Sequence, residues 1–110
     1  MSNSAKIAAL NDALRRTFTG GRVMKTDGID GLDTSVEAKV MRAVRNFAQF
    51  SGDNDPFSEH DFGSIEVDDH RVLFKIDYFE KGSQLSAGAE HPENSETTER
   101  VLTIMLAEEY

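Results

Sequence analysis

The sequence predicts one α+β domain in which two helices pack on one face of a small, mainly antiparallel sheet. Three observations support this class. The chain has 110 residues, a length typical of a single domain. Apolar residues recur at helical spacing in two segments of the N-terminal half, and they follow strand-like patterns in the C-terminal half. We therefore expect a helix, a short strand, a second helix and then a three-stranded meander.

The N-terminal half contains the two predicted helices. Residues 5–18 form the first, with Ser4 as its cap and Gly20-Gly21 as its end. Its apolar stripe consists of Ile7, Leu10, Leu14 and Phe18. A short strand is predicted over residues 22–26. Thr34 or Ser35 is expected to cap the second helix, and its apolar face is predicted to continue to Phe50.

A β-hairpin is predicted after a helix-breaking stretch at residues 51–56. Residues 62–67 and 71–79 are strand-like, and Asp68-Asp69 between them can form a tight two-residue turn. This turn sets a register in which Gly63 lies opposite Phe74, so that the ring covers the glycine backbone. The same register places His60 opposite Asp77.

The C-terminal part combines a long loop with a final strand. Residues 81–97 are rich in Gly, Ser, Glu and Asn, and Leu85 is their one large apolar side chain. We expect this loop to be mobile. Residues 101–106 have apolar side chains at both odd and even positions, which is typical of a strand covered on both faces. The segment also contains good helix formers, so a helix is the alternative.

Charge is distributed unevenly along the chain. Residues 1–45 carry 8 Lys and Arg against 5 Asp and Glu, whereas residues 46–110 carry 4 against 15, giving balances of +3 and −11. An acidic surface of this kind favours a basic protein partner and repels phosphates, so no direct nucleic-acid binding is expected. Solubility alone is the simpler explanation of the same charge.

The composition also excludes several classes of function. The absence of cysteine excludes disulfides, thiolate metal sites and cysteine nucleophiles. No segment has the apolar length of a membrane span and no leader is evident, so we expect a cytoplasmic protein without membrane contact. No glycine-rich phosphate loop is present and no cofactor is expected. A homodimer is compatible with these observations.

The densest polar stretch, residues 53–63, contains the candidate metal ligands Asp53, Asp55, Glu59 and Asp61. Carboxylates are the ligands that Ca²⁺ and Mg²⁺ prefer. However, the stretch lacks the glycine and the bidentate glutamate that a calcium loop needs at fixed positions. We therefore expect no metal here, and these four residues are weak candidates.

The candidate catalytic residues are His60, Asp77 and Lys75. A carboxylate bonded to one ring nitrogen of His60 would orient the imidazole as a general base. Lys75 would project from the same strand face as Asp77 and could bind an anion. The structural alternative is a cross-strand pair that only fixes the register of the hairpin.

Four segments resemble a family of small bacterial proteins described only as a domain of unknown function. They are IAALNDALRRTFTGGRV from residue 7, NDPFSEHDFG from residue 54, KIDYF from residue 75 and RVLTIMLAEEY from residue 100. The family is frequent in plasmid-bearing proteobacteria, which implies an accessory role linked to mobile elements. Its members often carry glycine where Ser58 stands. Its motifs include the residues that we take as candidate binding residues: Asn54, Asp55, Glu59, Asp61 and Tyr78.

Two functions follow from these observations. The first is a small acidic, non-catalytic interaction module or inhibitor that docks on a basic partner and could imitate nucleic acid. The alternative is a small enzyme or metal-binding domain that uses His60, Asp77, Lys75 and Glu59. The first has more weight, because polar clusters in small acidic domains more often serve structure than catalysis.

Overall fold

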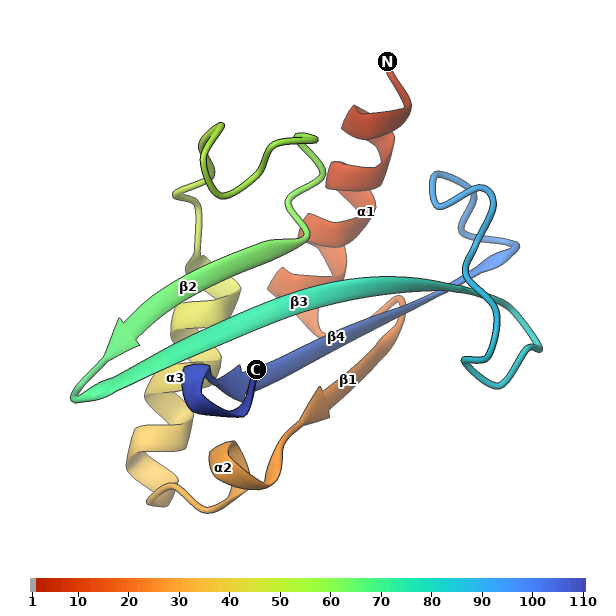
Figure 1. Ribbon diagram of the computed structural model, residues 1–110. Coiled ribbons are helices and arrows are strands. Elements are labelled where there is room, and N and C mark those ends of the chain that lie inside the picture. The colour runs from red at the N-terminus through yellow and green to blue at the C-terminus, as the bar shows by residue number, and fades with distance from the viewer. Residues whose placement is uncertain (1) are drawn as a thin grey trace.

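Four strands form one mixed sheet, and the helices α1 and α3 cover one of its faces (Figure 1). The computed structural model describes residues 2–110. The elements are α1 (Asn3–Thr17), β1 (Arg22–Lys25), α2 (Asp27–Asp30), α3 (Thr34–Asn46), β2 (Phe62–Val67), β3 (His70–Glu80), β4 (Thr98–Leu106) and the 3-10 turn η1 (Ala107–Glu109). The predicted α+β class is confirmed. The element order differs in detail, because the short helix α2 lies between the predicted strand and the predicted second helix.

The strand order β1-β4-β3-β2 places β4 between β1 and β3. The strands β2, β3 and β4 form the predicted antiparallel meander. The strand β1 pairs with β4 in parallel, with Arg22 aligned with Val101. Residues 101, 102, 104 and 105 of β4 are all buried, so a strand covered on both faces is confirmed over the helix alternative.

The β2–β3 hairpin has the predicted register. It runs from Phe62 opposite Lys75 to Val67 opposite His70. Asp68 adopts the left-handed conformation, with a φ of 51°. A tight hairpin turn needs this conformation, and Asp tolerates it better than most residues with a side chain.

Gly63 lies against the ring of Phe74, as predicted. A Cβ atom at this position would come within 2.7 Å of Cζ of Phe74, so only glycine fits without a shift. The pairing continues one residue beyond β2, where the carbonyl of Asp61 accepts a bond from Ile76 N at 2.8 Å. At His60 the chain leaves the strand direction, with a φ of 58°.

The helix boundaries differ from the prediction because side chains cap the backbone. The cap of α1 is Ser2, whose Oγ accepts a bond from Ala5 N at 3.2 Å, so the helix begins earlier than expected. The helix α3 ends at Asn46, and residues 47–50 continue without helical structure. Within residues 2–110, no helix combines the length and the apolar character needed to cross a membrane.

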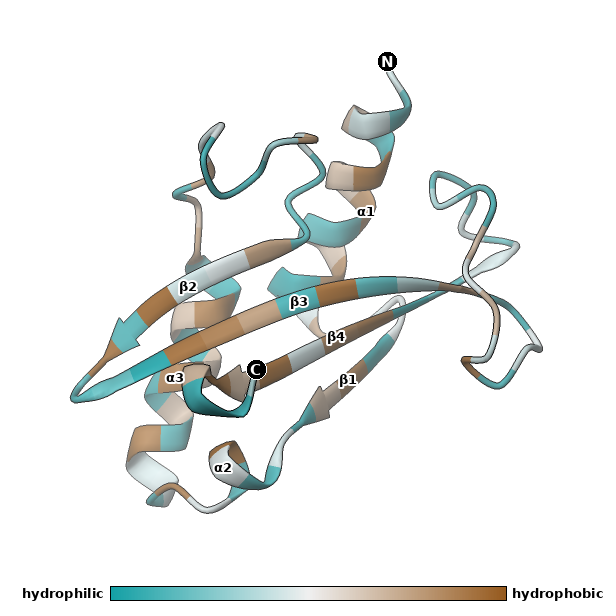
Figure 2. Ribbon diagram, in the orientation of Figure 1, coloured by the Kyte–Doolittle hydropathy of each residue, from teal (hydrophilic) through white to brown (hydrophobic). Residues whose placement is uncertain are grey.

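The main core lies between the sheet and the helices. Figure 2 shows hydrophobic residues along β3 and β4, whereas residues 51–61 are largely hydrophilic. The core side chains are Leu14, Ile29, Val40, Val44, Val67, Val72, Phe74, Ile76, Leu102 and Ile104. The opposite face of the sheet carries a smaller buried group formed by Leu73, Val101 and Met105.

Residues 81–97 form a loop, as predicted, but hydrogen bonds hold part of it against the end of β3. Ala89 N donates to Tyr78 O at 3.1 Å, and Glu80 N donates to Ala87 O at 2.8 Å. These bonds place the middle of the loop beside β3. The mobility of the loop stays a prediction.

Candidate functional site

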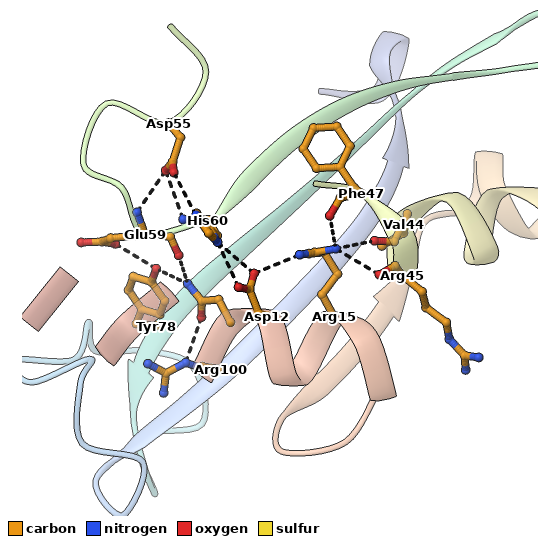
Figure 3. Close-up of polar contacts among 11 residues, drawn as sticks. Asp12, Arg15, Val44, Arg45, Phe47, Asp55, Glu59, His60, Tyr78 and Arg100 are labelled. Carbon is orange, nitrogen blue, oxygen red and sulfur yellow. Dashed lines mark hydrogen bonds and ion pairs between the residues drawn. The ribbon is translucent and has the colours of Figure 1, made fainter. Parts of the chain in front are cut away.

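A buried polar network joins α1 to the strands and to the loop of residues 51–61 (Figure 3). Its centre is Asn11, a fully buried side chain on α1. Asn11 Nδ2 donates to the carbonyl of Glu59 at 2.9 Å and to the hydroxyl of Tyr78 at 2.8 Å. Asn11 Oδ1 accepts a bond from Arg100 Nε at 2.9 Å. One amide therefore fixes β3, β4 and the loop relative to α1.

Tyr78 forms the β3 side of this network. Its hydroxyl accepts the bond from Asn11 and donates to Glu59 Oε1 at 2.9 Å. Cζ of Arg100 lies 5.4 Å from the ring centroid. Burial raises the pKa of Tyr78 well above its ordinary value, and the bond to Glu59 adds to the rise. The hydroxyl therefore stays protonated at neutral pH and serves as a fixed donor.

Arg15 joins α1 to the end of α3. Its Nη1 donates to the carbonyls of Val44, Arg45 and Phe47 at 3.0, 3.2 and 2.7 Å. Its Nη2 forms an ion pair with Asp12 at 2.9 Å. The last carbonyls of a helix have no partner within the helix. The buried guanidinium supplies one, which accounts for the early end of α3.

Arg100 is the second buried arginine. Besides its bond to Asn11, it donates through Nη2 to the carbonyl of Pro92 in the loop of residues 81–97. None of the ion pairs found among residues 2–110 includes Arg100. Burial lowers the pKa of Arg100, as it does that of Arg15. Both remain charged, because a guanidinium does not lose its proton in proteins.

His60 pairs with Asp12 on α1, so the predicted pair with Asp77 is wrong. The ring nitrogen Nδ1 lies 3.0 and 3.1 Å from the two carboxylate oxygens of Asp12. The other nitrogen, Nε2, lies 3.8 Å from Asp55 Oδ2. The imidazole stacks on Phe50, with ring centroids 4.1 Å apart and an interplanar angle of 1°.

The physical reason lies in the backbone before β2. The register of the hairpin is correct, but the left-handed conformation of His60 ends the strand pairing before this residue. Asp77 forms an ion pair with Lys75 instead, with 3.0 Å between Oδ2 and Nζ. These two residues share a strand face, as predicted, but they pair with each other and not with the imidazole.

Asp55 shapes the loop that carries His60. Its buried Oδ1 accepts bonds from the backbone N–H groups of Glu59 at 3.0 Å and His60 at 3.1 Å. Ser58 has a φ of 58°, a conformation that favours glycine and agrees with the glycine that the resemblance implies there. Asn54 makes two further bonds within residues 49–54. Both residues therefore stabilise the loop, and a role of theirs in binding stays a prediction.

The four candidate metal ligands make different contacts. Asp53 is exposed, Asp55 accepts backbone bonds, and Glu59 accepts a bond from Tyr78. In the described part of the chain, no group of three or more His, Asp or Glu side chains is placed to hold a metal ion.

Four carboxylates gather near the start of β2, and we call them the acidic cluster: Asp55, Glu59, Asp61 and Asp77. Partial burial raises the pKa of Asp61, and repulsion from the other three members adds to the rise. Among residues 2–110, Lys75 is the one lysine or arginine that forms an ion pair with a member of the cluster. The local potential is therefore negative.

The sequence analysis missed the residues of α1 that hold this site together. Asn11 and Arg15 lie four residues apart and on the same buried side of the helix as Ile7 and Leu14. Polar side chains within an apolar stripe are a usable signal, because buried polar groups almost always have hydrogen-bond partners. The identity of those partners required the tertiary structure.

No curated protein and no solved structure matches the chain significantly. One family model, described as "Protein of unknown function (DUF3768)", matches residues 25–109. The match extends from the last residue of β1 to η1 and includes the acidic cluster. The helix α1, with Asn11 and Arg15, precedes it. Because the match covers most of the sequence, the chain belongs to the DUF3768 family.

Proposed function

We propose that this protein is a small, non-catalytic interaction module that recognises a basic protein partner through its acidic cluster. One observation carries the proposal: Asp55 accepts bonds from the backbone of Glu59 and His60, and Asp61 pairs with Ile76 next to Asp77, so four carboxylates lie together. Four carboxylates with one paired lysine keep a net negative charge, which attracts a cationic partner and speeds its association.

The state of the remaining polar groups supports an interaction role over catalysis. The hydroxyl of Tyr78 already donates to Glu59 and accepts from Asn11. Lys75 is paired with Asp77. Groups whose donors and acceptors are used within the fold position the structure and leave little to bind or activate a substrate. The part-exposed carboxylates Asp61 and Asp77 are what the surface offers to a partner.

We further propose that the partner is a nucleic-acid-binding protein and that this chain inhibits it in the cytoplasm. Closely spaced carboxylates present the same sign of charge as a phosphate backbone, and they repel nucleic acid itself. The resemblance to a family frequent in plasmid-bearing bacteria favours an accessory role of this kind, linked to mobile elements.

Affinity capture tests the proposed function. The immobilised protein is exposed to extract from its host at about 0.1 M and about 1 M salt, a change that shortens the Debye length from about 10 Å to about 3 Å. Captured proteins are identified by mass spectrometry and then purified. We expect a basic protein whose binding weakens steeply with salt.

Matched variants then locate the binding charge. Asp61→Asn/Asp77→Asn removes two members of the acidic cluster, and Asp27→Asn/Asp33→Asn removes the same charge at exposed positions near the starts of α2 and α3. We expect the association rate to fall several-fold for the first variant only. Binding that resists salt, or equal effects of both variants, would contradict the proposal.

A second candidate function, catalysis, rests on the Asp12–His60 pair. A carboxylate on Nδ1 orients an imidazole as a general base, and His60 borders a surface hollow of about 270 Å³ next to Phe50 and Ser58. The free nitrogen faces Asp55, however, which leaves less access for a substrate. Turnover of an ester, phosphoester or amide panel by the wild type, lost in His60→Gln, would establish catalysis.

The metal-binding alternative has its own test. Mg²⁺, Ca²⁺ or Zn²⁺ is added while the unfolding midpoint is followed, because a bound ion stabilises the folded state. A rise that Asp53→Asn and Asp61→Asn abolish would favour a metal site over the interaction role. Unchanged midpoints would favour the interaction role.

A further inference from the structure

The strand β2 forms one edge of the sheet, and its outward backbone groups are unpaired. The bond from Ile76 N to Asp61 O fixes the alternation of the β2–β3 pairing, so Gly63 and Ile65 face β3. The N–H and C=O groups of Phe62, Ser64 and Glu66 therefore point away from the sheet. Outside the β2–β3 ladder, no backbone hydrogen bond found among residues 2–110 uses those of Ser64 or Glu66. A row of free backbone groups is a template for another strand.

A groove runs beside this edge. It has a volume of about 570 Å³ and lies between β2 and residues 46–49, which follow from the end of α3. Phe47 and Ile65 provide apolar surface in the groove, and Gln49 provides an amide. Ser64 and Glu66 are exposed and also line the groove, together with Arg71, whose Nη2 lies 3.4 Å from Glu66 Oε1. An added strand would thus meet apolar side chains and the Arg71–Glu66 ion pair.

The charge around β2 indicates which strand would bind. Residues 59–69 contain five Asp and Glu and no Lys or Arg, and two of the five pair with cations from elsewhere, Glu66 with Arg71 and Asp68 with Lys39. A second copy of this chain would bring the same negative charges together along the new pairing, and like charges across strands are destabilising. A segment with lysine or arginine at alternate positions would place them near Asp61 at the start of β2 and near the Asp68-Asp69 turn at its end.

We propose that β2 binds an extended basic segment of the partner protein as a fifth strand, with alternating cationic and apolar side chains. The main-chain bonds would give affinity, and the groove and the carboxylates would select the sequence. This inference rests on the proposed function and adds the mode of recognition. It also accounts for an exposed sheet edge that natural proteins usually blunt with lysine or proline.

The probe is a fluorescein-labelled octapeptide of alternating lysine and valine, measured by fluorescence anisotropy. Its control has the same sequence with N-methyl groups on alternate residues, which removes backbone donors and keeps the charge. We expect the control to bind at least about tenfold more weakly. Bound probe should also slow amide exchange at Ser64 and Glu66, while residues of β1 stay unchanged.

A protein variant gives the complementary test. Ser64→Pro removes one outward N–H, a change that an edge strand tolerates because this group is outside the ladder. Ser64→Ala is the matched control. We expect the proline variant to bind the probe about tenfold more weakly and the alanine variant to bind it as the wild type does. The N-methylated probe and the amide exchange decide the question even if Ser64→Pro folds poorly.

The outcomes separate this inference from the proposed function. If both peptides bind equally, with strong salt dependence and without protection of Ser64 and Glu66, the acidic surface binds a basic partner but strand addition is wrong. If neither peptide nor any basic protein binds at low salt, both proposals fail. Formation of a dimer that protects the same amides would also overturn the inference.

Discussion

The two regions that bury an arginine satisfy its charge in different ways. Around Arg15, the guanidinium meets three backbone carbonyls at the end of α3 and the carboxylate of Asp12. Around Arg100, it meets the amide of Asn11, one backbone carbonyl and the face of Tyr78. The two side chains are 0% and 2% exposed, so burial is not what distinguishes them.

The two arginines differ in the groups that would be left unpaired if the arginine were replaced. The carbonyls at a helix C-terminus carry partial negative charge and Asp12 carries a full one, so Arg15 balances an anionic site. The partners of Arg100 are neutral dipoles and an aromatic ring. An unpaired charge costs more free energy than an unpaired dipole. The fold should therefore depend more on Arg15, even though its Nε is buried without a partner.

Replacing Arg15 should have the largest effect. Arg15→Met keeps much of the volume but removes the cation from the end of α3 and leaves Asp12 with His60 as its remaining side-chain partner. We expect a loss of about 3 kcal/mol in the free energy of unfolding, measured by urea denaturation. Arg16→Met, at an exposed position on the same helix, is the control and should change it by less than about 0.5 kcal/mol. Similar losses of stability in Arg15→Met and Arg16→Met would show that the buried charge of Arg15 is not the cause of the loss.

Replacing Arg100 should cost less. Arg100→Met leaves only Asn11 Oδ1 and the carbonyl of Pro92 unpaired, which corresponds to about 1 to 2 kcal/mol in the same measurement. The loop of residues 81–97 loses an anchor, so its amides should exchange faster. Arg22→Met is the exposed control. A loss as large as that of Arg15→Met would show that neutral dipoles compensate a buried cation as a carboxylate does.

Removing the hydroxyl of Tyr78 tests the contribution of a single neutral group in the network around Arg100. Tyr78→Phe removes one donor and one acceptor while the ring still faces Arg100. We expect a loss of about 1 kcal/mol, because Asn11 and Glu59 each lose one partner. Tyr110→Phe, at a largely exposed position, should have no measurable effect. An unchanged free energy of unfolding in Tyr78→Phe would mean that water replaces the hydroxyl.

The smallest expected effect is an increase in the free energy of unfolding, caused by Asp61→Asn. The pKa of Asp61 is raised in the folded state, so folding favours its protonated form. The wild type therefore loses stability as pH rises from the unfolded-state pKa of about 3.9 through the folded-state value. The variant should be more stable at neutral pH, by up to about 0.5 kcal/mol, and equal below about pH 3. Urea denaturation at both pH values, with Asp33→Asn as the control, checks this; a gain independent of pH would contradict the cause.

Local sequence patterns were sufficient to predict the elements that are determined by residues close together in the sequence. The turn at Asp68-Asp69 and the alternation on both sides of it determine the hairpin register, including the contact of Gly63 with Phe74. The parallel pairing of β1 with β4 has no local signal, because the two strands are distant in sequence. The end of α3 was also unpredictable, since its cap is Arg15, supplied by another helix.

The candidate site was predicted less well than the fold. The sequence identified the loop around His60 and the negative charge near it, and both belong to the site. The partner of His60 was wrong because strand pairing was extended one residue too far, past a left-handed conformation that no local pattern announces. Asp12 became its partner through the packing of α1, which sequence spacing does not encode.

The central place of β4 has a consequence for the order in which the molecule assembles. This strand is the last of the four in the sequence, yet it joins β1 to the meander. On the ribosome, β1 and all three helices emerge before the strand that completes their sheet. Until then β1 has no partner and β3 exposes one edge, a state that is slow to resolve and prone to association with other chains. Folding of the whole domain must therefore wait for residues 98–106.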